Sequence, residues 1–226
     1  MLLLSADTSG KHGSIALAQC GPEGECTILE VVPLTGGTFS AQLVPQITAL
    51  LQKRRFGKGD IDAFAVASGP GSFTGLRVGL AAIKALAEVL GKPIAAVSVL
   101  QAVAETAKLD GRVLAALDAG RGEIYLGEYE GQGDDNTPVI LSERLLTKEE
   151  FLNAAKGATV VTPDKSVTDL ATAAGLRVQE TERPRSDAIA RIGWRKIQAG
   201  ETTSAEALDA NYIRRSDAEI LAKTSF

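Results

Sequence analysis

The sequence predicts an α/β protein built from two related lobes, each with the element order βββαβα. Short apolar runs typical of strands alternate with longer segments in which apolar residues recur at helical spacing. The pattern then restarts half-way along the chain, where RVLAALDAG (112–120) is similar to LLLSADTSG (2–10). Asp118 takes the place in the second copy that Asp7 has in the first. We therefore divide the chain into a first lobe, 1–109, and a smaller, more degenerate second lobe, 110–226.

The first lobe begins with three predicted strands and continues with alternating helices and strands. Ser40 can cap the first helix, in which Leu43, Ile47 and Leu50 share one face. A second, longer helix is predicted over 75–90, with Gly91 as its C-terminal stop. The other elements predicted here are strands over 2–6, 13–20, 27–34, 61–68 and 93–99, and a helix over 100–108.

The second lobe repeats this order less regularly. Thr147 and Glu150 form a capping box for a helix that runs to Ala155. The remaining predictions are strands over 112–120, 122–130, 139–141 and 158–163, a helix over 186–199, and a charged peripheral tail over 210–226. Two such lobes are typical of the actin-like and hexokinase-like architecture, the ASKHA fold, in which an aspartate of the first hairpin loop works near metal and phosphate.

Composition limits the possible functions. The formal net charge is −4 and no basic stripe is visible, so we expect RNA, if it is involved, to be held by a partner. The N-terminus lacks the basic region of a signal peptide, and no uncharged stretch without proline or glycine is long enough to span a membrane. Cys20 and Cys26 flank a five-residue turn that could bring them together, yet two thiols in such a chain are more simply interpreted as reduced.

A glycine-rich loop precedes the second helix, and two interpretations of it stand. Its spacing fits neither a Walker P-loop nor a Rossmann loop, because no lysine follows and the glycines are one residue too far apart. The helix N-terminus favours an anion, but only by roughly 0.3–1 kcal/mol. The other interpretation, which we favour, is a tight turn whose glycines allow close packing. The residues concerned are Gly69, Gly71, Ser72 and Gly75.

The stretch ADTS is the better candidate for phosphate. Asp7 could hold hydrated Mg²⁺ while Thr8 and Ser9 donate to phosphate, and Asp118 is the corresponding carboxylate of the second lobe. A hairpin turn closed by these side chains is an equally good interpretation. The sequence has a single histidine, His12, which excludes an H-E-x-x-H zinc site, so we predict no metal centre and no catalytic residue.

Four segments make the resemblance to a known family specific: SADTSG, SGPGSFTGLRVGLAAIKALA, LDAGRGEIYLGEYE and NYIRRSDAE. In this order the chain resembles the TsaB (YeaZ) family, accessory proteins in the synthesis of threonylcarbamoyladenosine in tRNA. The larger paralogue TsaD carries an H-x-x-x-H metal motif where this sequence has Val99 and Val103, and valine binds no metal. The resemblance implies a cytoplasmic, non-catalytic subunit without a cofactor of its own, with ATP or ADP and Mg²⁺ expected only in the assembled complex.

The resemblance also implies partners. It predicts a heterodimer with TsaD, assembly with the ATPase TsaE, self-association of the free chain, and contact with tRNA only through TsaD. The complex would modify adenosine 37 of tRNAs that read ANN codons. The resemblance implies that the partner packs on the helices over 40–54 and 75–90, and the second of these helices is apolar or small on almost every side. The candidate interface residues are Leu43, Ile47, Leu50, Leu76, Val78, Ala82 and Leu86.

One alternative remains at this point, a stand-alone enzyme. An actin-like ATP hydrolase or phosphotransferase would use Asp7 and Asp118. The absence of a second strong phosphate loop in the sequence argues against this alternative.

Overall fold

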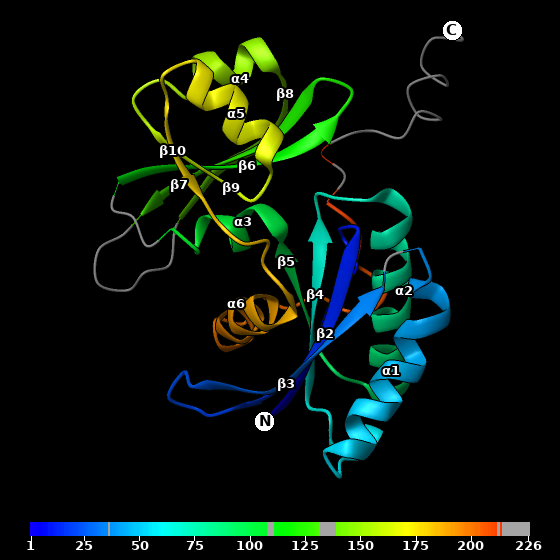
Figure 1. Cartoon of the computed structure of the whole chain (residues 1–226). Helices are drawn as coiled ribbons and strands as arrows, with labels where there is room; N and C mark the ends of the chain where they lie inside the picture. Colours follow the sequence, from blue (N-terminus) through cyan, green and yellow to red (C-terminus); the bar gives the residue numbers. More distant parts are fainter. Residues whose placement is uncertain (36, 108–110, 132–138, 212, 214–226) are drawn as a thin grey trace, which may run out of the picture. The chain divides into compact units, whose positions relative to one another are not determined.

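A computed structural model describes residues 1–35, 37–107, 111–131, 139–211 and 213. The chain divides into two compact units, and each contains one five-stranded sheet (Figure 1). The first unit joins Met1–Ala102 to Glu182–Ala210. The second comprises the described parts of Val103–Thr181 and Asn211–Phe226.

The sheet of the first unit has the strand order β3-β2-β1-β4-β5. Its strands are β1 (Leu2–Asp7), β2 (His12–Cys20), β3 (Cys26–Thr35), β4 (Ala63–Gly69) and β5 (Ile94–Ser98). β1 pairs antiparallel with β2 and parallel with β4, so the edge between β1 and β4 brings the ends of two parallel strands together. β1 and β4 are buried along their whole length, as expected for central strands covered on both faces.

Helices cover both faces of this sheet. α1 (Phe39–Lys53) and α2 (Phe73–Leu90) lie side by side on one face, and α6 (Ser186–Gln198) lies on the other (Figure 1). A Cβ atom on Gly193 of α6 would lie 2.4 Å from the Cβ atom of Ala65, so glycine there lets α6 approach β4 closely. The short helices are η1 (Lys58–Asp60) and α3 (Val99–Ala104).

The sheet of the second unit repeats the arrangement of the first. Its order, β10-β9-β6-β7-β8, is that of the first sheet with each strand replaced by its counterpart. The elements are β6 (Gly111–Gly120), β7 (Glu123–Gly131), β8 (Val139–Thr147), α4 (Lys148–Ala154), β9 (Thr159–Thr162), α5 (Lys165–Ala173) and β10 (Arg177–Glu180). The prediction of an actin-like α/β fold with an internal duplication is confirmed.

The observed repeat is βββαβαβα, one strand and one helix longer than the repeat unit βββαβα assigned from the sequence. In the second copy, α5 and β10 were not predicted. β8 was expected to end at Leu141 but runs to Thr147, and it is an edge strand that buries few side chains. β10 is a four-residue edge strand, and α5 buries only Val167 and Ala171, so both elements carry a weak apolar pattern in the sequence.

The ends of the helices follow their local chemistry. Ser72 caps α2 by accepting a hydrogen bond from the Gly75 amide, and Gly91 ends that helix in the left-handed conformation, as predicted. The capping box of Thr147 and Glu150 is also present. The prediction for Ser40 is wrong: α1 begins at Phe39 with Thr38 at the cap position, because buried Phe39 extends the helix toward the core.

The division of the chain differs from the predicted one in the segment that contains α6. Residues 182–210 belong to the first unit, because α6 packs on its sheet and Thr203 pairs with Ile94 of β5. The order of elements in the sequence cannot show which sheet a late helix covers. Among the described residues, no helix is long and apolar enough to cross a membrane.

Candidate functional site

The two copies of the fold place an aspartate in the same local structure. The Oδ1 atom of Asp7, at the end of β1, accepts a hydrogen bond of 2.8 Å from the amide of Ser9. The Oδ1 atom of Asp118, near the end of β6, accepts one of 2.7 Å from the amide of Gly120. Both are Asx turns between the first two strands of a repeat. The duplication thus extends to the hydrogen bonding of the candidate carboxylates.

The surroundings of these aspartates differ. Asp7 is buried, and burial raises the pKa of its carboxyl group above the ordinary value, although hydrogen bonding with Ser9 and the charge of Arg183 act to lower it. Asp118 is exposed, and hydrogen bonds from the Ser166 hydroxyl and the Gly120 amide lower the pKa of its carboxyl group. Each aspartate lies in its own unit. No sequence pattern indicated that Arg183 lies near Asp7.

These opposite pKa shifts predict opposite effects of amidation on stability. Because its pKa is raised, protonated Asp7 favours the folded state. This stabilisation is complete at pH values below the ordinary aspartate pKa and is lost as the pH rises through the raised pKa of Asp7. We therefore expect Asp7→Asn to raise the melting temperature near pH 7 and to have little effect in acid. Asp118→Asn should lower the melting temperature near pH 7. The ionised carboxylate of Asp118 stabilises the folded state, and this stabilisation is lost only as the pH falls through the lowered pKa of Asp118.

Thermal unfolding of both variants and the wild-type chain, followed between pH 3 and pH 8, measures these effects. The two variants serve as controls for each other, since both remove a carboxylate from the same kind of turn. A lower melting temperature for Asp7→Asn at pH 7 would contradict the prediction.

The glycines before and within α2 pack against the loop that follows Asp7. A Cβ atom on Gly71 would lie 2.4 Å from the carbonyl oxygen of Ser9, and one on Gly75 would lie 2.1 Å from the carbonyl oxygen of Thr8. One turn later, a Cβ atom on Gly79 would lie 2.3 Å from Thr8 Oγ1. Real Cβ atoms do not approach other atoms so closely, so these positions require glycine.

Hydrogen bonds join the same two segments. The hydroxyl of Thr8 donates to the carbonyl oxygen of Gly75 over 2.7 Å, and the amide of Ser72 donates to the carbonyl oxygen of Ser9 over 2.7 Å. Groups proposed for phosphate are therefore bonded within the protein. The Ser9 hydroxyl is buried and has no hydrogen-bond partner among the described residues, so a ligand at this loop would find one unoccupied donor. Nucleotide binding by Asp7, Thr8, Ser9 and Asp118 stays a prediction, as does anion binding at Gly69–Gly75.

The candidate interface residues fall into two groups. Four of them are core residues, because they pack inward from α1 and α2 against the first sheet; these are Leu43, Ile47, Leu50 and Leu76. Their side chains leave no surface for a partner. The other three, Val78, Ala82 and Leu86, are half-buried: they pack against the edge of the same core, and part of each side chain remains exposed.

The solvent side of α2 carries a second apolar stripe, which we call the outer stripe. It consists of Val78, Ala81, Ala82, Ala85, Leu86 and Val89. Their spacing of three and one residues places them on one side of a helix, away from the core residues Leu80 and Ile83. Val89 is 78% exposed, and on neighbouring α1 the side chain of Val44 is 49% exposed. A soluble helix usually has one apolar stripe, so the outer stripe needs a further explanation.

Comparisons with known proteins agree with this architecture. A family model described as "TsaD: tRNA N6-adenosine threonylcarbamoyltransferase" matches residues 31–157, more than half of the 226-residue chain. The protein "tRNA threonylcarbamoyladenosine biosynthesis protein TsaB" of Haemophilus influenzae is 34% identical over 163 residues, which are 68% of this chain and 67% of that protein. The chain belongs to the TsaB (YeaZ) family.

Two further relatives cover nearly the whole length of this TsaB family member. The protein of the same name from Escherichia coli is 29% identical over 95% of both chains. A crystal structure from Pseudomonas aeruginosa, described as an uncharacterized protein with similarity to peptidase YEAZ, is 27% identical and superposes with a TM-score of 0.76 over 94% of this chain and 99% of that one. Both units therefore have counterparts in the TsaB family.

Proposed function

We propose that this TsaB family member is a non-catalytic subunit in the synthesis of threonylcarbamoyladenosine in tRNA, and that it binds and activates TsaD. The names of its relatives support the pathway. The single observation that carries the mode of action is the outer stripe of α2. With exposed Val44 of α1, the helix beside α2, the outer stripe makes up what we call the α1–α2 outer face.

The residues of the α1–α2 outer face suit packing against another helix. Alanine at positions 81, 82 and 85 lets a second helix approach closely, while Val78, Leu86 and Val89 supply apolar area. Each large aliphatic side chain that a partner covers fully could add up to about 1.5–3 kcal/mol.

Two observations favour a subunit without catalysis of its own. Val99 and Val103, which the resemblance places at the positions of the TsaD metal motif, are buried aliphatic side chains. Asp7, the carboxylate that an ATP hydrolase would need in the first unit, is buried, and burial raises its pKa. We therefore propose no cofactor for this chain, and place ATP or ADP, Mg²⁺ and TsaE in the assembled complex only.

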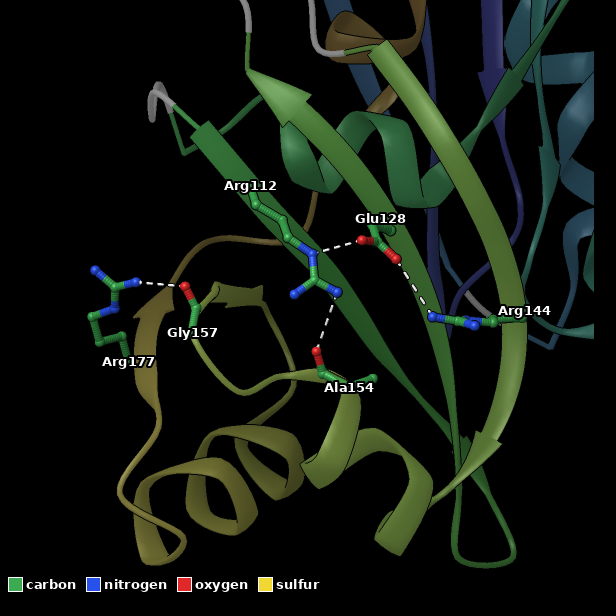
Figure 2. Close-up of polar contacts among 6 residues, drawn as sticks. All are labelled: Arg112, Glu128, Arg144, Ala154, Gly157 and Arg177. Carbon is green, nitrogen blue, oxygen red and sulfur yellow. Dashed lines mark hydrogen bonds and ion pairs between the residues drawn. The ribbon is translucent and has the colours of Figure 1, made fainter.

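We propose that tRNA is held through TsaD and that the complex acts on tRNAs reading ANN codons. The net charge of −4 disfavours RNA binding by this chain. In addition, Arg112, Arg144 and Arg177 of the second sheet form ion pairs or hydrogen bonds with other residues of the same unit (Figure 2). Glu128 forms ion pairs with Arg112 at 2.6 Å and with Arg144 at 3.4 Å, and Arg112 and Arg177 also donate to the carbonyl oxygens of Ala154 and Gly157.

The proposal is tested by mixing the purified chain with TsaD of the same organism. Light scattering on a sizing column should give the mass of a one-to-one heterodimer at micromolar concentrations. We propose that the chain is cytoplasmic and that it self-associates through the same face when alone, so the heterodimer should form at the expense of any homodimer. Separate peaks with and without ATP would overturn the proposal, and ATP turnover by the chain alone that is lost in Asp7→Ala would favour a stand-alone enzyme.

A further inference from the structure

Two cysteines face each other at the end of the β2–β3 hairpin. Cys20, the last residue of β2, is the register partner of Cys26, the first residue of β3, and their sulfur atoms are 3.4 Å apart. Both thiols are free. The next pair along the hairpin is hydrogen-bonded, because the amide of Gly21 donates to the carbonyl oxygen of Glu25. Cys20 and Cys26 therefore form a non-hydrogen-bonded pair, whose Cα atoms ordinarily lie about 4.5 Å apart, within the range for a disulfide.

Contacts with other segments hold both backbones of the pair in place. The amide of Cys20 donates to the carbonyl oxygen of Met1 over 2.8 Å, and Arg191 of α6 donates to the carbonyl oxygen of Cys26 over 2.9 Å. Gln198 of α6 holds the turn between the cysteines by donating to the carbonyl oxygen of Pro22 over 3.1 Å. A bond between the two sulfur atoms would thus form without moving the hairpin.

The two thiols differ in access and in acidity. Cys20 is buried, 3% exposed, whereas Cys26 is half-buried. The hydrogen bond from Cys20 lowers the pKa of Cys26, and the nearby charges of Arg191 and Arg195 lower it further against the effect of burial. The same hydrogen bond and burial raise the pKa of Cys20. Cys26 is therefore suited to attack first, with Cys20 as the resolving thiol.

We propose that Cys20 and Cys26 form a reversible thiol–disulfide site that reacts with low-molecular-weight disulfides. The thiolate of Cys26 attacks one sulfur of the small disulfide, forms a mixed disulfide and releases one small thiolate, which takes up a proton. Cys20 then gives its proton to solvent, and its thiolate attacks the sulfur of Cys26 and expels the second small thiolate. The two protein thiols are oxidised, and one small disulfide is reduced to two thiols.

This site is independent of the α1–α2 outer face and of the proposed binding of TsaD. Oxidation would close the five-residue turn covalently, next to the two side chains of α6 that hold it. Because thiol–disulfide exchange is reversible, the chain would have two covalent states, dithiol and disulfide, that share the same fold.

The test is incubation of the full chain with oxidised glutathione. Thiol titration should show the loss of both free thiols, and intact mass and a non-reducing gel should show a monomer without bound glutathione. The variant Cys20→Ala should keep glutathione on Cys26, because the resolving thiol is missing. The variant Cys26→Ser should react about tenfold or more slowly at Cys20, since burial and the raised pKa limit its thiolate.

Three results would overturn the proposal: wild-type chain that keeps glutathione bound, wild-type chain that forms linked dimers, or equal reaction rates of the two variants. Thermal unfolding of each variant before oxidation separates these results from misfolding. Hydrogen exchange at the amides of Gly21 and Glu25 gives a second readout. It should slow in the oxidised wild-type chain and stay unchanged in Cys26→Ser after the same treatment.

Discussion

We expect the double substitution Ala81→Glu and Ala85→Glu to weaken the proposed binding of TsaD strongly while leaving the fold intact. Both side chains are exposed on the solvent side of α2, so glutamate there meets water in the free chain and costs little stability. In the complex, two carboxylates would be buried against an apolar surface without partners. We expect the dissociation constant to rise about 30-fold or more, which corresponds to about 2 kcal/mol. Isothermal titration calorimetry with purified TsaD measures this change.

A matched control comes from the second unit. Ala173 lies in the last turn of α5 and is also exposed, so Ala173→Glu introduces one glutamate, half the added charge, on a helix outside the proposed face. It should leave the affinity for TsaD unchanged. All variants should unfold at the temperature of the wild-type chain. Wild-type affinity of the α2 double variant would place the interface elsewhere.

Replacing Gly75 with alanine is expected to cause the largest loss of stability among substitutions that add a single methyl group. The new Cβ atom would lie 2.1 Å from the backbone carbonyl oxygen of Thr8, which cannot move without shifting the hairpin loop that holds Asp7. Overpacking of this kind costs about 1–3 kcal/mol, which exceeds the gain in helix propensity. Urea unfolding should show a lower midpoint for Gly75→Ala. At the exposed Gly59, where a Cβ atom would meet open space, the same change should have an effect within about 0.5 kcal/mol.

Gly79→Ala offers a sharper version of the same argument, because its Cβ atom would meet the side-chain oxygen of Thr8 rather than the backbone. Adding Thr8→Ala should therefore recover part of the stability lost in Gly79→Ala. It should not recover the loss in Gly75→Ala, since the carbonyl oxygen remains. A double-mutant cycle measures the difference, and equal coupling of Thr8 to both glycines would contradict this account.

The sequence predicted the fold better than it predicted which surfaces are free. The central strands and the ends of α2 were found because burial and caps leave local patterns. α5 buries few side chains and β10 is an edge strand, so their patterns are weaker. Helical spacing correctly placed Leu43, Ile47 and Leu50 on one face of α1. It could not tell that this face is the one that covers the sheet. The outer stripe of α2 could not be separated from the core-facing stripe for a related reason. When a helix carries two apolar stripes, the sequence pattern alone does not show which one faces the sheet.

At the candidate site, the sequence predicted the turn residues but not their neighbours. Asp7 and Asp118 could be paired through the internal repeat because the repeat preserves residue order. The contacts of Thr8 with Gly75 and Gly79 depend on how closely α2 approaches the β1–β2 loop, and the charge of Arg183 comes from a segment far along the chain. Such distances are set by tertiary packing, which local patterns do not report.

The return of α6 to the first sheet has a consequence for the order of events during synthesis. Ribosomes release the chain from its N-terminus, so β1, β2, β4 and β5 emerge long before the helix that covers one of their faces. The segment 103–181, which carries the sheet of the second unit, lies between β5 and α6 in the chain and can fold before α6 emerges. Until residues 182–210 have emerged, the nascent first unit carries an uncovered apolar sheet face, and that interval is when we expect it to need a chaperone most.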